Sequence, residues 1–322
     1  MVSRMRRPIA VLVVAAAAAA GSLSASATTT HPAGAPNSIA VNGTPLAIAS
    51  GYGSLWVAGH DATVLYRIDP ATGRIRARIG EGTNACGPLG VAFNRIWIGH
   101  CDTGNTDAVV DARTNRVVGR VNGLAFGFGF ASAWVDAQQQ NPTVLNRIDP
   151  RTFRVLDRIQ VGSGTRDAVS AGGFMWNVNS DEGTLSQISP SSNRVVRTIR
   201  YGGSGSSYGI VAAGKIWILD VADNAVYTVA PHTQAVRKLP IRLSFSSDFD
   251  DPYMVVAGGR VWFLSANEGF DVKGLVAVDA SSGRIVRRVN VPSGFGPYFA
   301  VVANSVWGAQ PMQDRVLRIP LS

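Results

Sequence analysis

The stretch 54-SLWVAGHDATVLYRIDPATGRIRARIG-80 decides the fold, because its pattern recurs along the whole chain. Its tryptophan is the first of seven, and successive tryptophans are 37 to 45 residues apart: Trp56, Trp97, Trp134, Trp176, Trp217, Trp262 and Trp307. A period near forty residues, made of short β-type runs, is typical of a propeller with four strands per blade. Seven copies therefore predict an all-β protein, a seven-bladed β-propeller of four-stranded antiparallel blades.

Each tryptophan belongs to a set of four predicted strands. A run of small apolar residues precedes it, such as 46-LAIAS-50, and near-continuous apolarity suits an innermost strand that neighbouring blades cover on both faces. After it come a strand, a tight turn with Asp-Pro, Gly or Asn, and a strand of alternating pattern, as in 66-YRIDPATGRIRARI-79. The predicted order is inner strand, tryptophan strand, third strand and outer strand.

The last repeat lacks an outer strand, because only 316-VLRIPLS-322 remains after the Trp307 strand. Residues 38–43 (SIAVNG) precede the first inner strand, where an outer strand is expected. We predict that this N-terminal segment pairs with the last blade, closes the ring and covers an open sheet edge. The alternative is that residues 38–43 are a disordered lead-in.

The N-terminus carries the pattern of an export signal. Residues 1–27 combine three arginines, an apolar run over 9–20 and a small-residue cleavage site, Ala25-Ser26-Ala27. The apolar run is too short to span a bilayer, and no other segment is long and apolar enough. We expect a secretory signal peptide over 1–27, a disordered leader over 28–37, one propeller domain over 38–322, and a secreted, extracellular protein. The Arg6-Arg7 pair leaves twin-arginine export as the alternative to the general route.

The two cysteines are predicted to form a disulfide. Cys86 precedes the inner strand of the second blade and Cys101 ends the next strand, so the hairpin brings them near each other. Exported proteins retain such bonds. A metal site or a catalytic thiol is the alternative, but the spacing of a metal motif and a partner constellation are both missing.

Charge is distributed unevenly over the repeat. The formal net charge is +9, yet 15 of the 21 acids fall in the loops that lead into the inner strands or in those that follow the tryptophan strands. In a propeller these two sets of loops share one face, here called the funnel face. Arginines instead concentrate in the opposite turns and in the outer strands. Such a basic rim either discourages pairing of exposed strand edges or makes weak contact with polyanions.

The funnel face supplies the candidate ligand site. Polar residues follow the tryptophans, and the lead-in loops add tyrosines and carboxylates, so we expect a negative mouth that attracts a cationic group, with aromatic faces beside it. The candidates are His60, His100, Asp136, Asp167, Asn179, Tyr208, Asp220, Asp250, Tyr253 and Tyr298. The loop 243-LSFSSDFDDPY-253 departs most from the repeat, and its three carboxylates could ligate a hard divalent cation, although they do not match the EF-hand spacing. The alternative for each acid is a turn cap.

No catalytic motif stands out: nucleophile elbow, His-Glu-x-x-His, P-loop and Cys/His cluster are all missing from the sequence. The patterns 45-PLAIASGYGSLWVA-58 and 67-RIDPATGRI-75 resemble exported bacterial YVTN-repeat (YncE-like) propellers over residues 38–322, with tryptophan in place of the signature tyrosine. The blades are also similar to the virginiamycin B lyase type of repeat. The first resemblance implies a surface or periplasmic binding role. The second implies a histidine base and carboxylate-held magnesium in the late blades, but no histidine follows His232.

The sequence therefore favours a secreted, non-catalytic binding or interaction propeller. We expect a monomer that takes a small-molecule or protein ligand on the acidic funnel face and needs no cofactor. The alternative is a lyase or hydrolase of the virginiamycin B lyase type that uses a divalent cation in the funnel.

Overall fold

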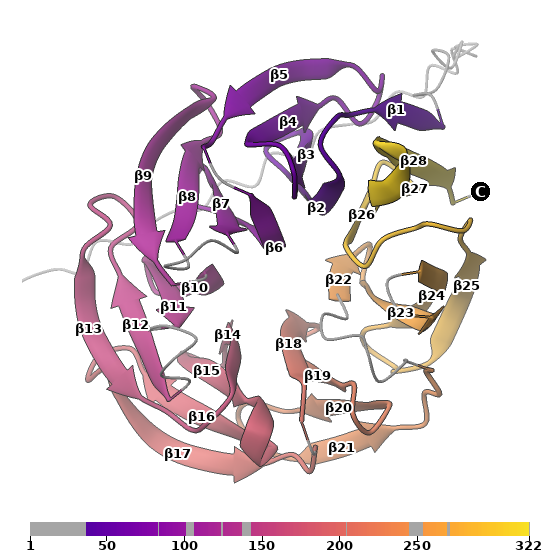
Figure 1. The fold of residues 1–322 in the computed structure, drawn as a ribbon. Coiled ribbons are helices and arrows are strands. Elements are labelled where there is room, and N and C mark those ends of the chain that lie inside the picture. The colour runs from indigo at the N-terminus through magenta and orange to yellow at the C-terminus, as the bar shows by residue number, and fades with distance from the viewer. Residues whose placement is uncertain are drawn as a thin grey trace, which may run out of the picture. The chain divides into compact units, whose positions relative to one another are not determined.

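The seven predicted blades form a closed ring (Figure 1). The computed structural model describes residues 37–82, 84–100, 106–123, 125–136, 143–203, 205–244, 254–268 and 271–321, which lie in one compact unit. All seven sheets are four-stranded and antiparallel, so the predicted fold class is confirmed. Within these ranges the helical segments are two short 3-10 turns, η1 (Ser180–Glu182) and η2 (Pro311–Gln313). No helix of the described chain is long and apolar enough to cross a membrane.

Blades 1 to 6 each use four consecutive strands, in the order inner, second, third and outer. Blade 1 contains β2 (Pro45–Gly51), β3 (Ser54–Gly59), β4 (Val64–Ile68) and β5 (Ile75–Gly80), and blade 2 contains β6 (Ala85–Ala92), β7 (Arg95–His100), β8 (Thr106–Asp111) and β9 (Arg116–Asn122). Blade 3 contains β10 (Ala125–Gly129), β11 (Ser132–Asp136), β12 (Val144–Ile148) and β13 (Val155–Gln160), and blade 4 contains β14 (Thr165–Ala171), β15 (Phe174–Asn179), β16 (Thr184–Ser189) and β17 (Arg194–Arg200). Blade 5 contains β18 (Ser207–Ala212), β19 (Lys215–Asp220), β20 (Ala225–Val229) and β21 (Val236–Leu239), and blade 6 contains β22 (Met254–Ala257), β23 (Arg260–Glu268), β24 (Asp271–Asp279) and β25 (Ile285–Asn290).

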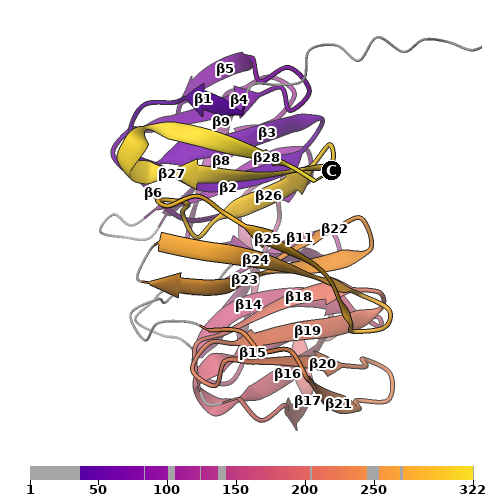
Figure 2. The same cartoon turned by 90° about the vertical axis from the view of Figure 1, so that its right-hand side faces the viewer.

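Blade 7 is completed by the N-terminal strand, as predicted. It consists of β26 (Phe299–Val302), β27 (Ser305–Gln310), β28 (Arg315–Pro320) and β1 (Ser38–Ala40), and β1 lies beside β28 in both views (Figures 1 and 2). Ile39 pairs with Val316 in this antiparallel contact. The strand ends earlier than the predicted 38–43, because the chain turns at Gly43, whose φ of 90° disfavours any residue with a Cβ.

The tryptophans form the repeated element of the core. All seven lie on the second strand of their blade and are fully buried. In four blades the indole N–H donates to the carbonyl oxygen that ends the inner strand of the same blade: Trp56 to Gly51 at 3.0 Å, Trp134 to Gly129 at 3.0 Å, Trp176 to Ala171 at 2.9 Å and Trp217 to Ala212 at 3.2 Å. In these four blades the buried indole therefore packs between blades with its donor satisfied, whereas the indole N–H groups of Trp97, Trp262 and Trp307 are buried without a hydrogen-bond partner in the described chain.

The turns between third and outer strands are built on aspartate. Asp69, Asp111, Asp149 and Asp279 each accept backbone N–H groups from the residues that follow them. These backbone hydrogen bonds favour the ionised carboxylate and hold the pKa of all four aspartates below the usual value. The Asp signals in the sequence thus correspond to Asx turns.

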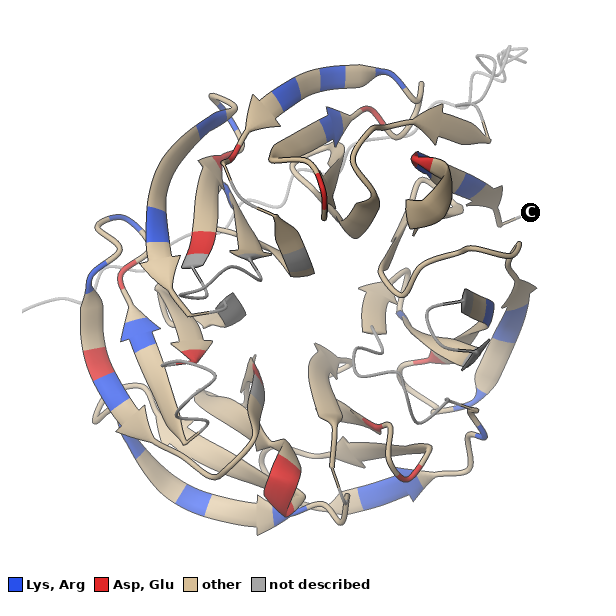
Figure 3. Cartoon of the chain, viewed as in Figure 1, with Lys and Arg blue, Asp and Glu red and all other residues tan. Residues whose placement is uncertain are grey.

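The outer strands are rich in positive charge (Figure 3). Strands β5, β9, β13, β17, β21 and β25 contain Arg76, Arg78, Arg116, Arg120, Arg158, Arg194, Arg197, Arg200, Arg237, Lys238, Arg287 and Arg288, against Asp157 as their one acid. Their long cationic side chains lie along sheet edges that have no further strand to pair with, which is a common protection against edge-to-edge association.

Candidate funnel-face site

The structure describes most of the predicted site residues. His60, Asp136, Asp167, Asn179, Tyr208, Asp220 and Tyr298 are described with their side chains. Asp250 and Tyr253 lie outside the described residues, as do Cys101 and the side chains of His100 and Cys86. The disulfide, the carboxylates of the 243–253 loop and any role of His100 therefore stay predictions.

Four of the predicted site residues are internal rather than presented to solvent. Asn179 and Asp220 are 0% exposed, Tyr298 is 2% exposed and Asp136 is 5% exposed. Asn179 uses its amide within blade 4, where it donates to Thr184 Oγ1 and Ser186 Oγ, both at 2.9 Å. The ends of the tryptophan strands therefore support their own blades.

Asp220 has a similar internal role in blade 5. Its carboxylate accepts hydrogen bonds from Ser207 Oγ at 2.8 Å and from the backbone N–H of Asp223 at 2.8 Å. Ser207 begins the inner strand and Asp223 belongs to the loop after the second strand, so the buried carboxylate joins the two loops of the blade.

Asp167 is hydrogen-bonded across neighbouring blades to Gly209, the residue that follows Tyr208. Asp167 lies on β14 and Tyr208 on β18, the inner strands of blades 4 and 5, and both side chains are partly exposed. The Asp167 carboxylate accepts the backbone N–H of Gly209 at 2.9 Å. A Cβ at Gly209 would lie 2.7 Å from Val178 Cγ2, so glycine permits this close approach. Asp167 and Tyr208 thus lie on adjacent inner strands of the ring.

A second group of polar residues lies where blades 7 and 1 meet. Thr44 donates its backbone N–H to Asp314 Oδ1 at 2.8 Å and its hydroxyl to Asp61 Oδ2 at 2.5 Å, and His60 Nδ1 lies 2.9 Å from Asp61 Oδ1. The hydrogen bonds from Thr44 and then from His60 hold the pKa of Asp61 below its usual value. The backbone of Thr44 has a φ of 52°, which is unusual for a β-branched residue. Two carboxylates on separate loops secure it.

Blade 4 repeats this arrangement with different residues. Ser163, in its lead-in loop, donates its backbone N–H to Glu182 Oε1 and its hydroxyl to Asp181 Oδ2, both at 2.8 Å. Thr44, Ser163 and Ser207 are thus lead-in residues that hydrogen-bond to an acid after the tryptophan strand. These hydroxyl residues were not among the predicted site residues. Their recurrence 13 to 18 positions before an aspartate was the signal that could have identified them.

The exposed acids of the funnel face are held by hydroxyl groups, backbone N–H groups and one imidazole. Asp61, Asp181, Glu182 and Asp314 are exposed, and in the described chain none of the four forms an ion pair with lysine or arginine. Among the described side chains, fewer cations lie on or beside these loops: exposed Arg242, exposed Lys273 on β24, and Arg315 at the start of β28, which donates to Gln310 Oε1 at 2.8 Å. The described part of the chain contains no group of three or more His, Cys, Asp or Glu residues arranged to hold a metal ion.

Comparison with known proteins supports the fold. No family model and no curated protein matches the sequence. Among solved structures, Kuenenia stuttgartiensis hydrazine synthase superposes with a TM-score of 0.67 at 14% identity, over 92% of this chain and 99% of that chain. A catalytically inactive virginiamycin B lyase from Staphylococcus aureus, solved with quinupristin, gives 0.66 at 12% identity, over 88% and 98%. BamB from Moraxella catarrhalis gives 0.56 at 11% identity, over 86% and 83%.

At these identities the likenesses concern the propeller fold alone. The resemblance of the blades to the virginiamycin B lyase type is thereby confirmed at the level of the fold. Membership of the YVTN-repeat family stays a hypothesis.

Proposed function

We propose that the protein is an exported, non-catalytic binding propeller whose funnel face takes a cationic ligand. The observation that carries the proposal is the set of exposed carboxylates Asp61, Asp181, Glu182 and Asp314, which hydroxyl and N–H donors hold without a lysine or arginine partner. Because neutral donors leave the carboxylate charge in place, this face is negative although the whole chain is positive.

Asp167 and Tyr208 are the proposed centre of the site. They offer a carboxylate and an aromatic ring on two adjacent inner strands, which is a rigid part of the scaffold. A carboxylate attracts an ammonium or guanidinium group, and an aromatic face adds a cation–π contact. The surrounding acids increase the local concentration of a cationic ligand and its rate of association.

The test uses a lysine-rich peptide as the cationic probe. Its affinity for the mature chain should fall as salt rises from low to physiological concentration. The triple variant Asp167→Asn, Asp181→Asn, Glu182→Gln should weaken binding about tenfold, since each exposed charge pair contributes about 0.2–1 kcal/mol. Asp220 is unsuitable for such a variant because its carboxylate is buried in hydrogen bonds within blade 5.

A matched control removes three acids from the opposite side. Asp69, Asp111 and Asp149 lie in the turns between third and outer strands, and Asn can keep their Asx turns. Binding should be unchanged in that variant. Equal losses in the two triple variants would assign the effect to net charge and refute a funnel-face site.

Native mass spectrometry of the secreted protein tests the remaining aspects of the proposal. We expect a monomer that begins at Thr28, after removal of the signal peptide, and carries an organic cation or no ligand. A stoichiometric divalent metal on the purified chain would contradict the non-catalytic assignment and support a lyase or hydrolase.

A further inference from the structure

Between blades 1 and 2 and between blades 3 and 4, an arginine that lies over a tryptophan bridges the neighbouring blades on the side of the ring that carries the Asx turns. The Arg67 guanidinium lies 4.9 Å from the centroid of the Trp56 ring and donates to the Ala112 carbonyl in the next blade at 2.7 Å. Its Nη1 also donates to Asn115 Oδ1 at 2.9 Å. The space between blades 1 and 2 above the indole is thus occupied by a guanidinium group.

Blades 3 and 4 are joined in the same way. Arg147 lies 5.3 Å from the centroid of the Trp134 ring and donates to the Pro190 carbonyl at 2.7 Å and to Asn193 Oδ1 at 2.6 Å. Each bridge therefore needs an arginine opposite the tryptophan and an asparagine at the end of the next turn. This asparagine adopts a left-handed conformation, with φ of 53° at Asn193.

Between blades 5 and 6 both parts of the bridge are absent. Thr228 pairs with Trp217 in the register that Arg67 and Arg147 occupy opposite their tryptophans. Gly283, with a φ of 72°, stands four residues after Asp279, at the turn position of the bridging asparagine. A hydroxyl and a glycine are much smaller than a guanidinium and an amide, so space is left between the two blades at this position, although Trp217 itself is fully buried.

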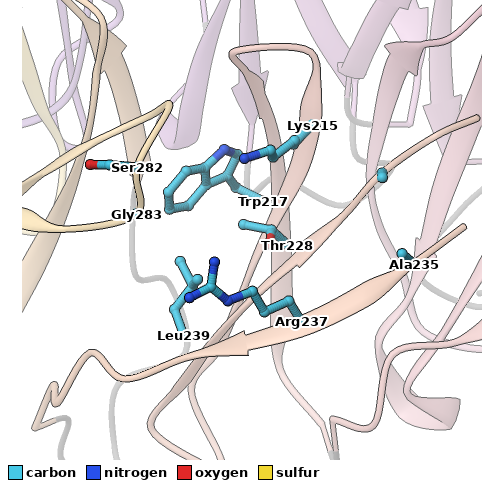
Figure 4. Close-up of a pocket in the computed structure, with 9 residues that line it drawn as sticks. Lys215, Trp217, Thr228, Ala235, Arg237, Leu239, Ser282 and Gly283 are labelled. Carbon is cyan, nitrogen blue, oxygen red and sulfur yellow. The ribbon is translucent and has the colours of Figure 1, made fainter. Parts of the chain in front are cut away.

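The result is a pocket of about 170 Å³ (Figure 4). Its lining includes Lys215, Trp217, Thr228, Arg237, Leu239 and Gly283. In Figure 4 the side chains of Lys215 and Arg237 lie on opposite sides of Trp217. A cavity of about 150 Å³ holds one benzene ring, whereas drug-sized ligands need roughly 300 Å³ or more. The pocket is therefore the size of a single small ring.

The polar groups of the pocket favour an anion. Lys215 Nζ donates to the Ser281 carbonyl at 3.2 Å, and the Arg237 side chain makes no hydrogen bond or ion pair with the described residues. The nearby Asp279 carboxylate accepts from both the N–H and the hydroxyl of Ser282 at 2.8 Å, so it is committed to its own turn. Two cationic side chains thus border an apolar floor.

We propose that this pocket binds a small carboxylate with a compact, flat apolar body, of which benzoate is the simplest example. The Arg237 guanidinium provides parallel donors that suit a carboxylate, and the ammonium group of Lys215 adds a second positive charge. The ring then lies in the pocket beside Ala235, Leu239 and Gly283, and Trp217 beneath it stays fully buried. The inference does not rest on the funnel-face proposal, because its residues belong to β19 to β21 and to the turn after β24.

Ligand-observed NMR titration of the intact mature protein tests the charge preference. Benzoate should bind saturably and at least tenfold more tightly than benzamide, its neutral counterpart, and benzamidinium should not bind. Equal affinity for benzoate and benzamide, or no saturable binding of benzoate, would overturn the proposal.

A matched pair of variants tests the location. Arg237→Gln should weaken benzoate binding about tenfold or more. Lys238→Gln removes the same charge at the next position of β21, where the side chain lies over Tyr227 instead, and should leave binding unchanged. Equal losses in both variants would show general attraction to the outer strands and refute the pocket.

A third variant fills the pocket. Thr228→Arg recreates the residue found in blades 1 and 3 and should abolish benzoate binding, with a melting temperature no lower than that of the wild type. Retained binding in a folded Thr228→Arg protein would contradict the proposed location. If this variant does not fold, the Arg237→Gln and Lys238→Gln pair still decides the question.

Discussion

Replacement of Arg147 by alanine should destabilise the propeller more than the same replacement of any exposed arginine. The guanidinium donates to four acceptors in two blades: Ser132 Oγ at 2.9 Å, Phe130 O at 3.1 Å, Pro190 O at 2.7 Å and Asn193 Oδ1 at 2.6 Å. Hydrogen bonds to charged groups contribute about 1.5–3 kcal/mol each, and a cation–π contact adds about 0.5–2 kcal/mol. These contributions do not add fully, and Arg147 is only partly buried. We therefore expect a loss of about 3 kcal/mol.

Thermal melting followed by circular dichroism measures this loss. A change of 1 kcal/mol shifts the melting temperature by about 2–4 °C in domains of this size class, so Arg147→Ala should melt roughly 6–12 °C below the wild type.

Arg158→Ala is the matched control. Arg158 lies on the outer strand of the same blade, is exposed, and its side chain has no hydrogen bond to the described residues. Its loss should cost less than about 0.5 kcal/mol. A melting temperature for Arg147→Ala within about 2 °C of that for Arg158→Ala would show that the contacts of Arg147 between the blades do not contribute to stability.

Three further results are expected. Cys86 and Cys101 should form a disulfide in the mature protein, which would close a loop of about 15 residues and stabilise the fold by about 3 kcal/mol. Thiol titration under denaturing, non-reducing conditions should therefore find no free thiol, whereas two free thiols would contradict the disulfide. Deletion of residues 28–44 should lower the melting temperature markedly because it removes β1 and its pairing with β28, while deletion of 28–36 should not; similar melting of the two truncations would show that closure adds little. Stability should fall as the pH drops below about 4. The reason is that four turn carboxylates have lower pKa values in the folded protein than in the unfolded chain: Asp69, Asp111, Asp149 and Asp279. Their contribution to stability is complete above the unfolded pKa and is lost as the folded carboxylates are protonated. Melting curves between pH 2 and 6 should show a smaller drop when all four are replaced by asparagine, and an unchanged drop would assign acid sensitivity to other groups.

The number of blades and the strand order could be predicted because they depend on local periodicity. Alternation of apolar and polar residues specifies a strand, and an aspartate followed by turn-forming residues specifies a turn. The tryptophan marks the second strand of each repeat, so none of these patterns depends on distant residues. Ring closure by the N-terminal segment was also predictable, because a propeller must cover the edge of its last blade. Only the end of β1 was misplaced, since a turn at Gly43 cannot be separated by pattern from a continuing strand.

The candidate site was less accessible from sequence. Loop position correctly predicted that Asp220 and Asn179 end a strand on one face, but the sequence does not say whether such a side chain faces solvent or a neighbouring loop. In the folded protein Ser207 and Thr184 lie beside them and take up their hydrogen bonds. Burial of this kind depends on how loops far apart in the chain pack together.

The sequence by itself therefore determined the repeat, the strands, the turns and the closed ring, because each follows from short-range patterns that seven copies reinforce. Only the tertiary structure decided which polar groups are available to a ligand. The contrast between Arg147 and Thr228 illustrates the reason: both stand opposite a tryptophan, and either residue suits a β-strand. Whether that position becomes a filled bridge or an open pocket depends on the turn of the next blade, which lies more than forty residues away along the chain.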